Sequence, residues 1–173
     1  MMTVIETARC YVREFSVSCI PEVFRLYEGE HFTDYIEPLL SVEEETEYRE
    51  NYIKKIYGKY GYGMWDVFDK ETGRLIGEAG LEHRTDSDRE KFPYDWMFDE
   101  HCAELGYCIA NDLWGQGYCT EVCKEILRYG TKKLGLKVFF ARAQRENAAS
   151  VRVLEKLGFI NLEGIYYRRE GLQ

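Results

Sequence analysis

A short glycine-bearing loop is the part of this 173-residue sequence best suited to chemistry. It runs from Trp114 to Cys119, and the surrounding pattern predicts a strand before it and a helix after it. The first turn of a helix has free backbone N–H groups and the positive end of the helix dipole, which together attract anions. Gly115 and Gly117 would let a diphosphate approach the backbone closely. The loop therefore predicts an anion site, and a tight turn without a ligand is the alternative.

Two other phosphate-binding motifs do not fit this loop. A dinucleotide-binding fingerprint needs glycine or alanine at position 120, where this chain has Thr120. A P-loop needs Gly-Lys followed by Ser or Thr, and that sequence does not occur in the loop. The anion is therefore expected to belong to a different kind of ligand.

Composition narrows the class of protein. The hydrophobic content of 45% fits a globular chain, and the net charge of −8, without a basic stripe, argues against a nucleic-acid partner. No apolar run approaches the roughly 20 residues that span a bilayer, and no signal segment is apparent, so we expect a cytoplasmic protein without a membrane partner. The six cysteines form no CxxC pair and the three histidines are scattered, so we expect reduced cysteines and no metal site.

Hydrophobic periodicity and turn residues predict the order of elements. Strands are expected at 10–15, 63–68, 75–81, 103–109 and 138–143, with a last strand or hairpin at 159–167. Helices are expected at 21–27, 41–57, 120–134 and 147–158, and 58–63 is expected to be a loop. Ser41 and Glu44 have the form of a capping box. This order predicts an α/β chain whose mixed sheet carries helices on both faces.

The segment 82–101 is expected to be an inserted loop. It carries Phe92, Tyr94, Trp96 and Phe98. Such an aromatic patch could cover an acceptor cleft, form a subunit contact or pack as a small satellite core.

A second segment, further along the chain, gives more information about the function than the loop alone. Gln144–Ser150 leads from a strand into a helix, and Leu157–Phe159 leaves that helix. Together these segments resemble the Gcn5-related N-acetyltransferase (GNAT) superfamily, in particular its RimJ/RimL-like branch. The matching pieces, in the family's order, are Glu6–Arg9 with Arg13–Phe15, Leu75–Gly77, Glu104–Tyr107, Trp114–Glu121, Asn147–Ser150 and Lys156–Phe159. The resemblance implies one acetyltransferase domain over 1–173, with a mixed, mostly antiparallel sheet of about seven strands.

The resemblance also implies that acetyl-CoA is the co-substrate. In this family the loop amides hold the pyrophosphate, and the preceding strand splays from its neighbour so that the pantetheine arm can pair with it. The implied contacts are Tyr107, Cys108, Ile109, Trp114, Gly115, Gln116, Gly117, Tyr118, Cys119, Thr120, Asn147 and Ser150. Trp114 replaces a long polar residue, a change that this branch often shows. Cys119 replaces a glycine or alanine and is small enough that we expect binding to survive. The 3′-phosphate could meet Arg145, Arg152 or Lys124.

The catalytic residues follow the family less closely. Many relatives have a tyrosine that protonates the leaving thiolate, where this chain has Leu154, which cannot donate a proton. Ser150 is the replacement candidate, and a local helix-start hydroxyl is its alternative role. Glu104 is the first candidate for the general base, ahead of Glu78 and Glu82. Asn147 is expected to cap its helix and to contact the coenzyme.

The expected activity is transfer of the acetyl group from acetyl-CoA to a primary amine, by direct attack. The acceptor could be a protein N-terminus or a small-molecule amine. Because of Leu154, the alternative is a non-catalytic acyl-CoA-binding sensor or pseudo-enzyme. A monomer and a homodimer are equally compatible with the sequence.

Overall fold

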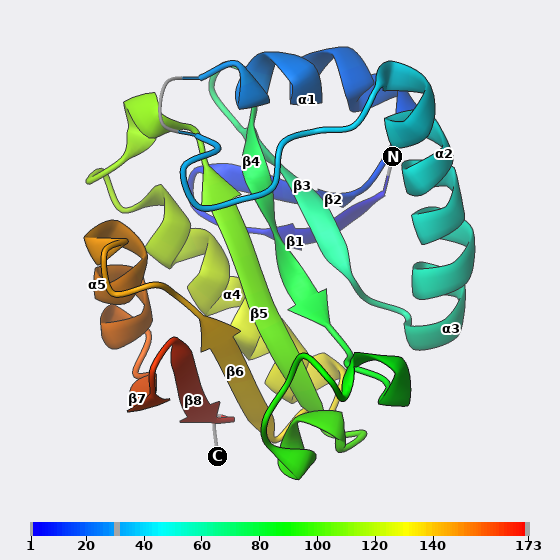
Figure 1. Ribbon diagram of the computed structural model, residues 1–173. Helices are drawn as coiled ribbons and strands as arrows, with labels where there is room; N and C mark the ends of the chain where they lie inside the picture. Colours follow the sequence, from blue (N-terminus) through cyan, green and yellow to red (C-terminus); the bar gives the residue numbers. More distant parts are fainter. Residues whose placement is uncertain (1, 30–31, 172–173) are drawn as a thin grey trace.

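The computed structural model describes residues 2–29 and 32–171, and its centre is one eight-stranded sheet (Figure 1). The strand order is β1-β2-β3-β4-β5-β6-β8-β7, and all neighbours are antiparallel except β5 and β6. The strands are β1 (Thr3–Glu6), β2 (Cys10–Glu14), β3 (Met64–Asp69), β4 (Leu75–Glu82), β5 (Cys102–Ile109), β6 (Val138–Arg142), β7 (Ile160–Glu163) and β8 (Tyr166–Glu170). The predicted mixed, mostly antiparallel sheet is confirmed; β1 was not predicted.

Five α-helices accompany the sheet within the described residues. They are α1 (Ile20–Tyr27), α2 (Val42–Tyr52), α3 (Gly58–Tyr60), α4 (Tyr118–Lys133) and α5 (Ala148–Lys156). The predicted capping box at the start of α2 is confirmed, since Ser41 Oγ accepts from Glu44 N–H and the Glu44 carboxylate accepts from Ser41 N–H. None of the helices within the described residues is long and apolar enough to cross a membrane.

The end of the α2 segment differs from the prediction. One turn of π-helix (Ile53–Tyr57) carries α2 directly into α3, so the expected loop at 58–63 is helical for its first three residues. Gly58 has an ordinary helical φ of −64°, and the helix ends where Gly61 adopts a φ of 72°. A glycine marks a helix end by its left-handed conformation, which the sequence alone does not reveal.

The two faces of the sheet carry different helices. On β3, Val67 belongs to the main core, which includes Ile126 and Leu127 of α4. The next residue, Phe68, points the other way and packs with Val23 of α1. This alternation is what a strand buried on both faces requires. Figure 1 shows α4 behind the sheet and α1 and α2 on the other side, as the sequence predicted.

The 82–101 segment is a satellite core. Phe92 and Met97 are buried and pack with Cys102 and Phe140. The centre of the Trp96 ring lies 6.0 Å from the centre of the Phe140 ring. These side chains cover the far end of β5 and β6. Of the three interpretations left open by the sequence, the packing supports the satellite core.

The tight packing of α4 on the sheet gives a testable prediction. A Cβ at Gly130 would lie 2.8 Å from Leu81 Cδ1 and 2.9 Å from a ring carbon of Phe139. We expect Gly130→Ala to lower the free energy of unfolding by about 1–3 kcal/mol because of overpacking, measured by urea unfolding. Gly58→Ala is the control, because no atom lies within 4 Å of its added Cβ. It should be neutral or stabilising by up to about 1 kcal/mol. If both substitutions change the free energy of unfolding equally, α4 is not tightly packed on the sheet at Gly130.

Candidate functional site

The site begins where β5 and β6 separate. Their parallel pairing is confined to three residue pairs, Cys102 with Val138, Ala103 with Phe139 and Glu104 with Phe140. β5 continues to Ile109 with its other edge still paired to β4. The backbone of β5 after Glu104 is therefore unpaired on one edge, as expected for a strand that splays before the loop.

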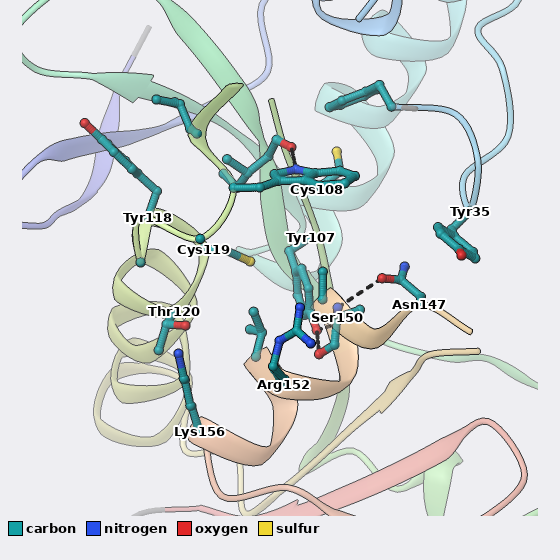
Figure 2. A pocket seen from close by; sticks show the side chains of 18 of the residues that line it. Tyr35, Tyr107, Cys108, Tyr118, Cys119, Thr120, Asn147, Ser150, Arg152 and Lys156 are labelled. Carbon is teal, nitrogen blue, oxygen red and sulfur yellow. Dashed lines mark hydrogen bonds between the residues drawn. The ribbon is translucent and has the colours of Figure 1, made fainter. Parts of the chain in front are cut away.

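A cavity of about 180 Å³ lies at this separation. It is bounded by β5, by the loop before α4, by one face of α5 and by the segment between α1 and α2 (Figure 2). The predicted coenzyme contacts that line this cavity are Tyr107, Cys108, Ile109, Trp114, Gly115, Gly117, Tyr118, Cys119, Thr120, Asn147 and Ser150. Residues that are more than 40 positions apart in the sequence thus share one cavity.

Phe32, Tyr35 and Ile36 also line the cavity but were not predicted. They lie in an irregular segment that has no hydrophobic periodicity to identify it. Their aromatic and aliphatic side chains form part of the cavity wall.

The glycine loop leaves backbone donors free at the start of α4. Gly115 and Gly117 have φ values of 75° and 84°, which suit glycine. Gly117 is the N-cap of α4 and has no side chain with which to cap it. The first-turn N–H groups, at Tyr118, Cys119 and Thr120, have no acceptor within the helix. An anion in the cavity could use them.

The loop is held in place by the turn between β1 and β2. Glu121 of α4 accepts from Thr7 Oγ1 at 2.6 Å and from Arg9 Nε at 2.7 Å. Arg9 also donates to Gln116 O at 3.1 Å, and its guanidinium lies 3.9 Å from the centre of the Tyr118 ring. Because C=O and N–H point in opposite directions across a trans peptide, the Gly117 N–H points away from Arg9.

Two side chains of the loop donate hydrogen bonds to backbone carbonyl groups of the preceding residues. Gln116 Nε2 donates to Asp112 O at 2.9 Å, and Gln116 does not line the cavity. Trp114 Nε1 donates to Ile109 O at 2.7 Å. Trp114 nevertheless remains 46% exposed and lines the cavity. Trp114 therefore occupies one backbone acceptor of β5 that the sequence assigned to the pantetheine arm.

The start of α5 carries two polar side chains, Asn147 and Ser150. Asn147 is the N-cap, as predicted, and its Oδ1 accepts from Ser150 N–H at 3.0 Å. Ser150 Oγ lies 2.9 Å from the hydroxyl of Tyr107, which the sequence had assigned only a backbone role. Leu154 is fully buried in the main core. Among these, Ser150 is the one predicted candidate for proton donation that reaches the cavity.

Two cations on α5 face the cavity. Arg152 and Lys156 are four residues apart, so they lie on one side of the helix. Figure 2 shows the Lys156 side chain directed toward Thr120, at the start of α4. Of the residues expected near the 3′-phosphate, Arg152 lines the cavity, whereas Arg145 and Lys124 do not. Lys156 was missed, although its helical spacing from Arg152 could have identified it.

Glu104 lies at the last paired position of β5 and does not line the cavity. Its carboxylate is nearly buried and is held by two arginines, with Arg84 Nε at 2.6 Å and Arg142 Nε at 2.7 Å. It could accept a proton from an amine only after one of these contacts opens. Its role as a general base remains a proposal.

Glu78 lies opposite Cys108 in the β4–β5 pairing, so both side chains lie on the same face. It is bound to the fully buried Arg49, whose guanidinium also holds Asp66 at 3.0 Å and Glu45 at 3.0 Å. Three carboxylates thus share one cation. Burial, reinforced by Asp66 and Glu45 and opposed by Arg49, raises the pKa of Glu78 to about 7. Burial likewise raises the pKa of Asp66 to about 6.

Comparison with known proteins agrees with this geometry. Residues 9–160 match the family model described as an acetyltransferase (GNAT) domain. The Bacillus subtilis (strain 168) protein named "Uncharacterized N-acetyltransferase YnaD" is 36% identical over 167 residues, which cover 96% of this chain and 84% of the relative.

Two solved structures share the fold. Ribosomal-protein-S5-alanine acetyltransferase from Vibrio fischeri has a TM-score of 0.76 at 18% identity, over 99% of this chain and 97% of that one. RimL, a ribosomal L7/L12 alpha-N-protein acetyltransferase solved with coenzyme A, has a TM-score of 0.71 at 16% identity, over 98% of both chains. This chain belongs to the GNAT acetyltransferase family and is an acyltransferase.

The shared cation at Arg49 predicts a pH-dependent stability. The folded-state pKa of Glu78 is raised from 4.5 to about 7, so the folded chain binds more protons than the unfolded chain between these values. The group therefore reduces stability as the pH rises through that window. We expect Glu78→Gln to gain stability relative to the unsubstituted protein, on the order of 1–2 kcal/mol, between pH 5 and 8, measured by urea unfolding.

The control for this measurement is Glu47→Gln, an exposed glutamate on α2. Its stability difference from the unsubstituted protein should not change with pH. If the Glu78→Gln difference is equally flat, the Glu78 carboxyl is ionised throughout and the assigned shift is wrong.

Proposed function

We propose that the chain transfers the acetyl group of acetyl-CoA to a primary amine. The observation that carries this proposal is the cavity at the separation of β5 and β6, which opens onto the uncapped start of α4. A thioester with a diphosphate-bearing arm fits these surroundings: free N–H groups for the diphosphate, cations at Arg152 and Lys156, and an unpaired strand edge for the arm.

Each part of the coenzyme would be held by its own set of residues. The N–H groups at Gly117, Tyr118 and Cys119 would bind the pyrophosphate, and the open edge of β5 near Tyr107 would pair with the pantetheine arm. Asn147 would contact the arm while it caps α5. Trp114 keeps Ile109 O occupied, so pairing with the arm would involve the remaining groups of β5.

The chemistry would be a direct attack of the neutral amine on the thioester carbonyl. The C–N bond forms, the C–S bond breaks, and coenzyme A leaves with the electron pair on sulfur. Ser150 would donate a hydrogen bond to that sulfur, because Leu154 offers none. A strong acid is not required, since a thiolate is a good leaving group.

The amine must lose a proton, and two carboxylates are candidates to accept it. A general base works best with a pKa near the working pH, which favours Glu78. Glu104 lies near the start of β5, before Cys108 with which Glu78 pairs, and is neutralised by Arg84 and Arg142. An α-amino group, with a pKa near 8, needs this help less than a lysine with a pKa near 10.4.

The acceptor is therefore expected to be an α-amino group or a small-molecule amine. The wall formed by Phe32, Tyr35 and Ile36 suits the apolar part of such a molecule. A protein N-terminus and a small amine fit equally, and the two solved structures named above are those of ribosomal-protein acetyltransferases.

A panel experiment separates an enzyme from a non-catalytic acyl-CoA sensor. The protein is mixed with acetyl-CoA and either peptides with free α-amino groups, alkyl diamines or amino sugars, and thiol release is followed. We expect release above background with at least one class, because the donor site is complete. Calorimetric binding of acetyl-CoA without release from any amine would establish the sensor instead.

The cations on α5 give a separate prediction. We expect Arg152→Gln/Lys156→Gln to raise the KM for acetyl-CoA about tenfold or more, since each charge-assisted contact to phosphate contributes about 1 kcal/mol or more. The KM for acetyl-dephospho-CoA should rise less, because the 3′-phosphate is already missing.

The matched control is Lys124→Gln/Arg145→Gln, which removes the same charge from residues outside the cavity. Its KM values should stay within about twofold. If the KM for acetyl-CoA rises equally in both double variants, the cations attract the coenzyme by their general charge and do not form a phosphate subsite.

A further inference from the structure

The two sides of the cavity are joined by one hydroxyl group. The hydroxyl of Tyr107, on β5, lies 2.9 Å from Ser150 Oγ and 3.2 Å from Ser150 O, on α5. Figure 2 shows these contacts beside the bond from Ser150 N–H to Asn147. Ser150 is therefore fixed at its nitrogen, its carbonyl oxygen and its side chain.

The Tyr107 hydroxyl has one proton to donate. Burial, reinforced by Cys119 and Cys123, raises the pKa of Tyr107 well above its usual range, so the phenol stays protonated. It can donate either to Ser150 O or to Ser150 Oγ. In the first arrangement the serine hydroxyl must donate to Tyr107. In the second the serine proton is free to point into the cavity.

We propose that Tyr107 is a positioning residue that donates to Ser150 Oγ and so directs the Ser150 proton toward the departing sulfur of coenzyme A. This inference rests on the proposed acetyl transfer. As the C–S bond breaks, sulfur keeps the electron pair and accepts a hydrogen bond from Ser150 Oγ. Because the Tyr107 hydroxyl donates to Ser150 Oγ, the serine hydroxyl becomes a stronger donor toward that sulfur. The proton lost by the amine goes to the general base, so the charges balance.

The buried side chain of Leu154 supports this role for the pair. Leu154 is fully buried in the main core and does not line the cavity, so it offers no donor there. The Tyr107 hydroxyl approaches the same cavity from β5 instead, through Ser150. A phenol is thus available near the reacting sulfur, although it comes from a different element and acts through a second residue.

Three variants test the proposal: Tyr107→Phe, Ser150→Ala and the combination of both. We expect each single substitution to lower kcat about three- to tenfold, the value of one hydrogen bond, with the Kd for CoA within about twofold. The double variant should be no slower than Ser150→Ala, because Tyr107 acts through Ser150. Tyr167→Phe, in another buried tyrosine of the same core, is the matched control and should match the unsubstituted protein.

A second measurement does not depend on turnover. The pKa of the CoA thiol in its complex is followed by the ultraviolet absorbance of the thiolate, against the protein without CoA. A hydroxyl donor favours the thiolate, so Tyr107→Phe and Ser150→Ala should both raise this pKa, and the double variant should raise it no further.

Two results would overturn the inference. One is a Tyr107→Phe variant with the thiol pKa and kcat of the unsubstituted protein. The other is a Tyr107→Phe effect of undiminished size in the Ser150→Ala background, which would reflect packing or direct contact. If no amine is acetylated, the proposed function fails while the thiol pKa still decides whether Tyr107 acts through Ser150.

Discussion

The separation of β5 from β6 is the constraint on which the site depends. A sheet normally satisfies both edges of an inner strand, yet here pairing stops after Glu104 while β5 runs on to Ile109. The chain after β6 instead turns into α5, whose first residues lie across the gap. The unpaired edge, the cavity and the proximity of Tyr107 to Ser150 all follow from this arrangement.

Packing on both sides keeps the gap open. β4 still pairs with every residue of β5 from Glu104 to Ile109, so the strand is held along one edge. α4 packs against β5 and β4, with Gly130 allowing close contact with Leu81 and Phe139. At the far end the satellite core covers the paired part of β5 and β6. The separation is therefore a property of a rigid scaffold.

Charge is distributed differently on the two faces of this scaffold. The start of α4, with Arg152 and Lys156 close by, is favourable to anions. On the α1 and α2 face, three carboxylates share the single guanidinium of Arg49, and burial raises the pKa values of Asp66 and Glu78. An anionic donor and a protonatable amine acceptor would thus meet complementary surroundings from opposite directions.

The sequence by itself determined the local features. The capping box at Ser41, the N-cap at Asn147 and the strand–glycine–helix order around Gly117 depend on neighbouring residues, and the structure shows all three. The ordered motifs also identified the family, because such sets are specific even when each piece is weak.

Only the tertiary structure decided which side chains meet. The two arginines that hold Glu104 are 20 and 38 residues away from it in the sequence. Tyr107 and Ser150 are 43 residues apart, and Trp114 turns back onto Ile109 O. The aromatic segment at 82–101 packs on Phe140 instead of entering the cavity. Such long-range contacts depend on the sheet order and on where β5 parts from β6, and neither leaves a local periodicity or spacing in the sequence.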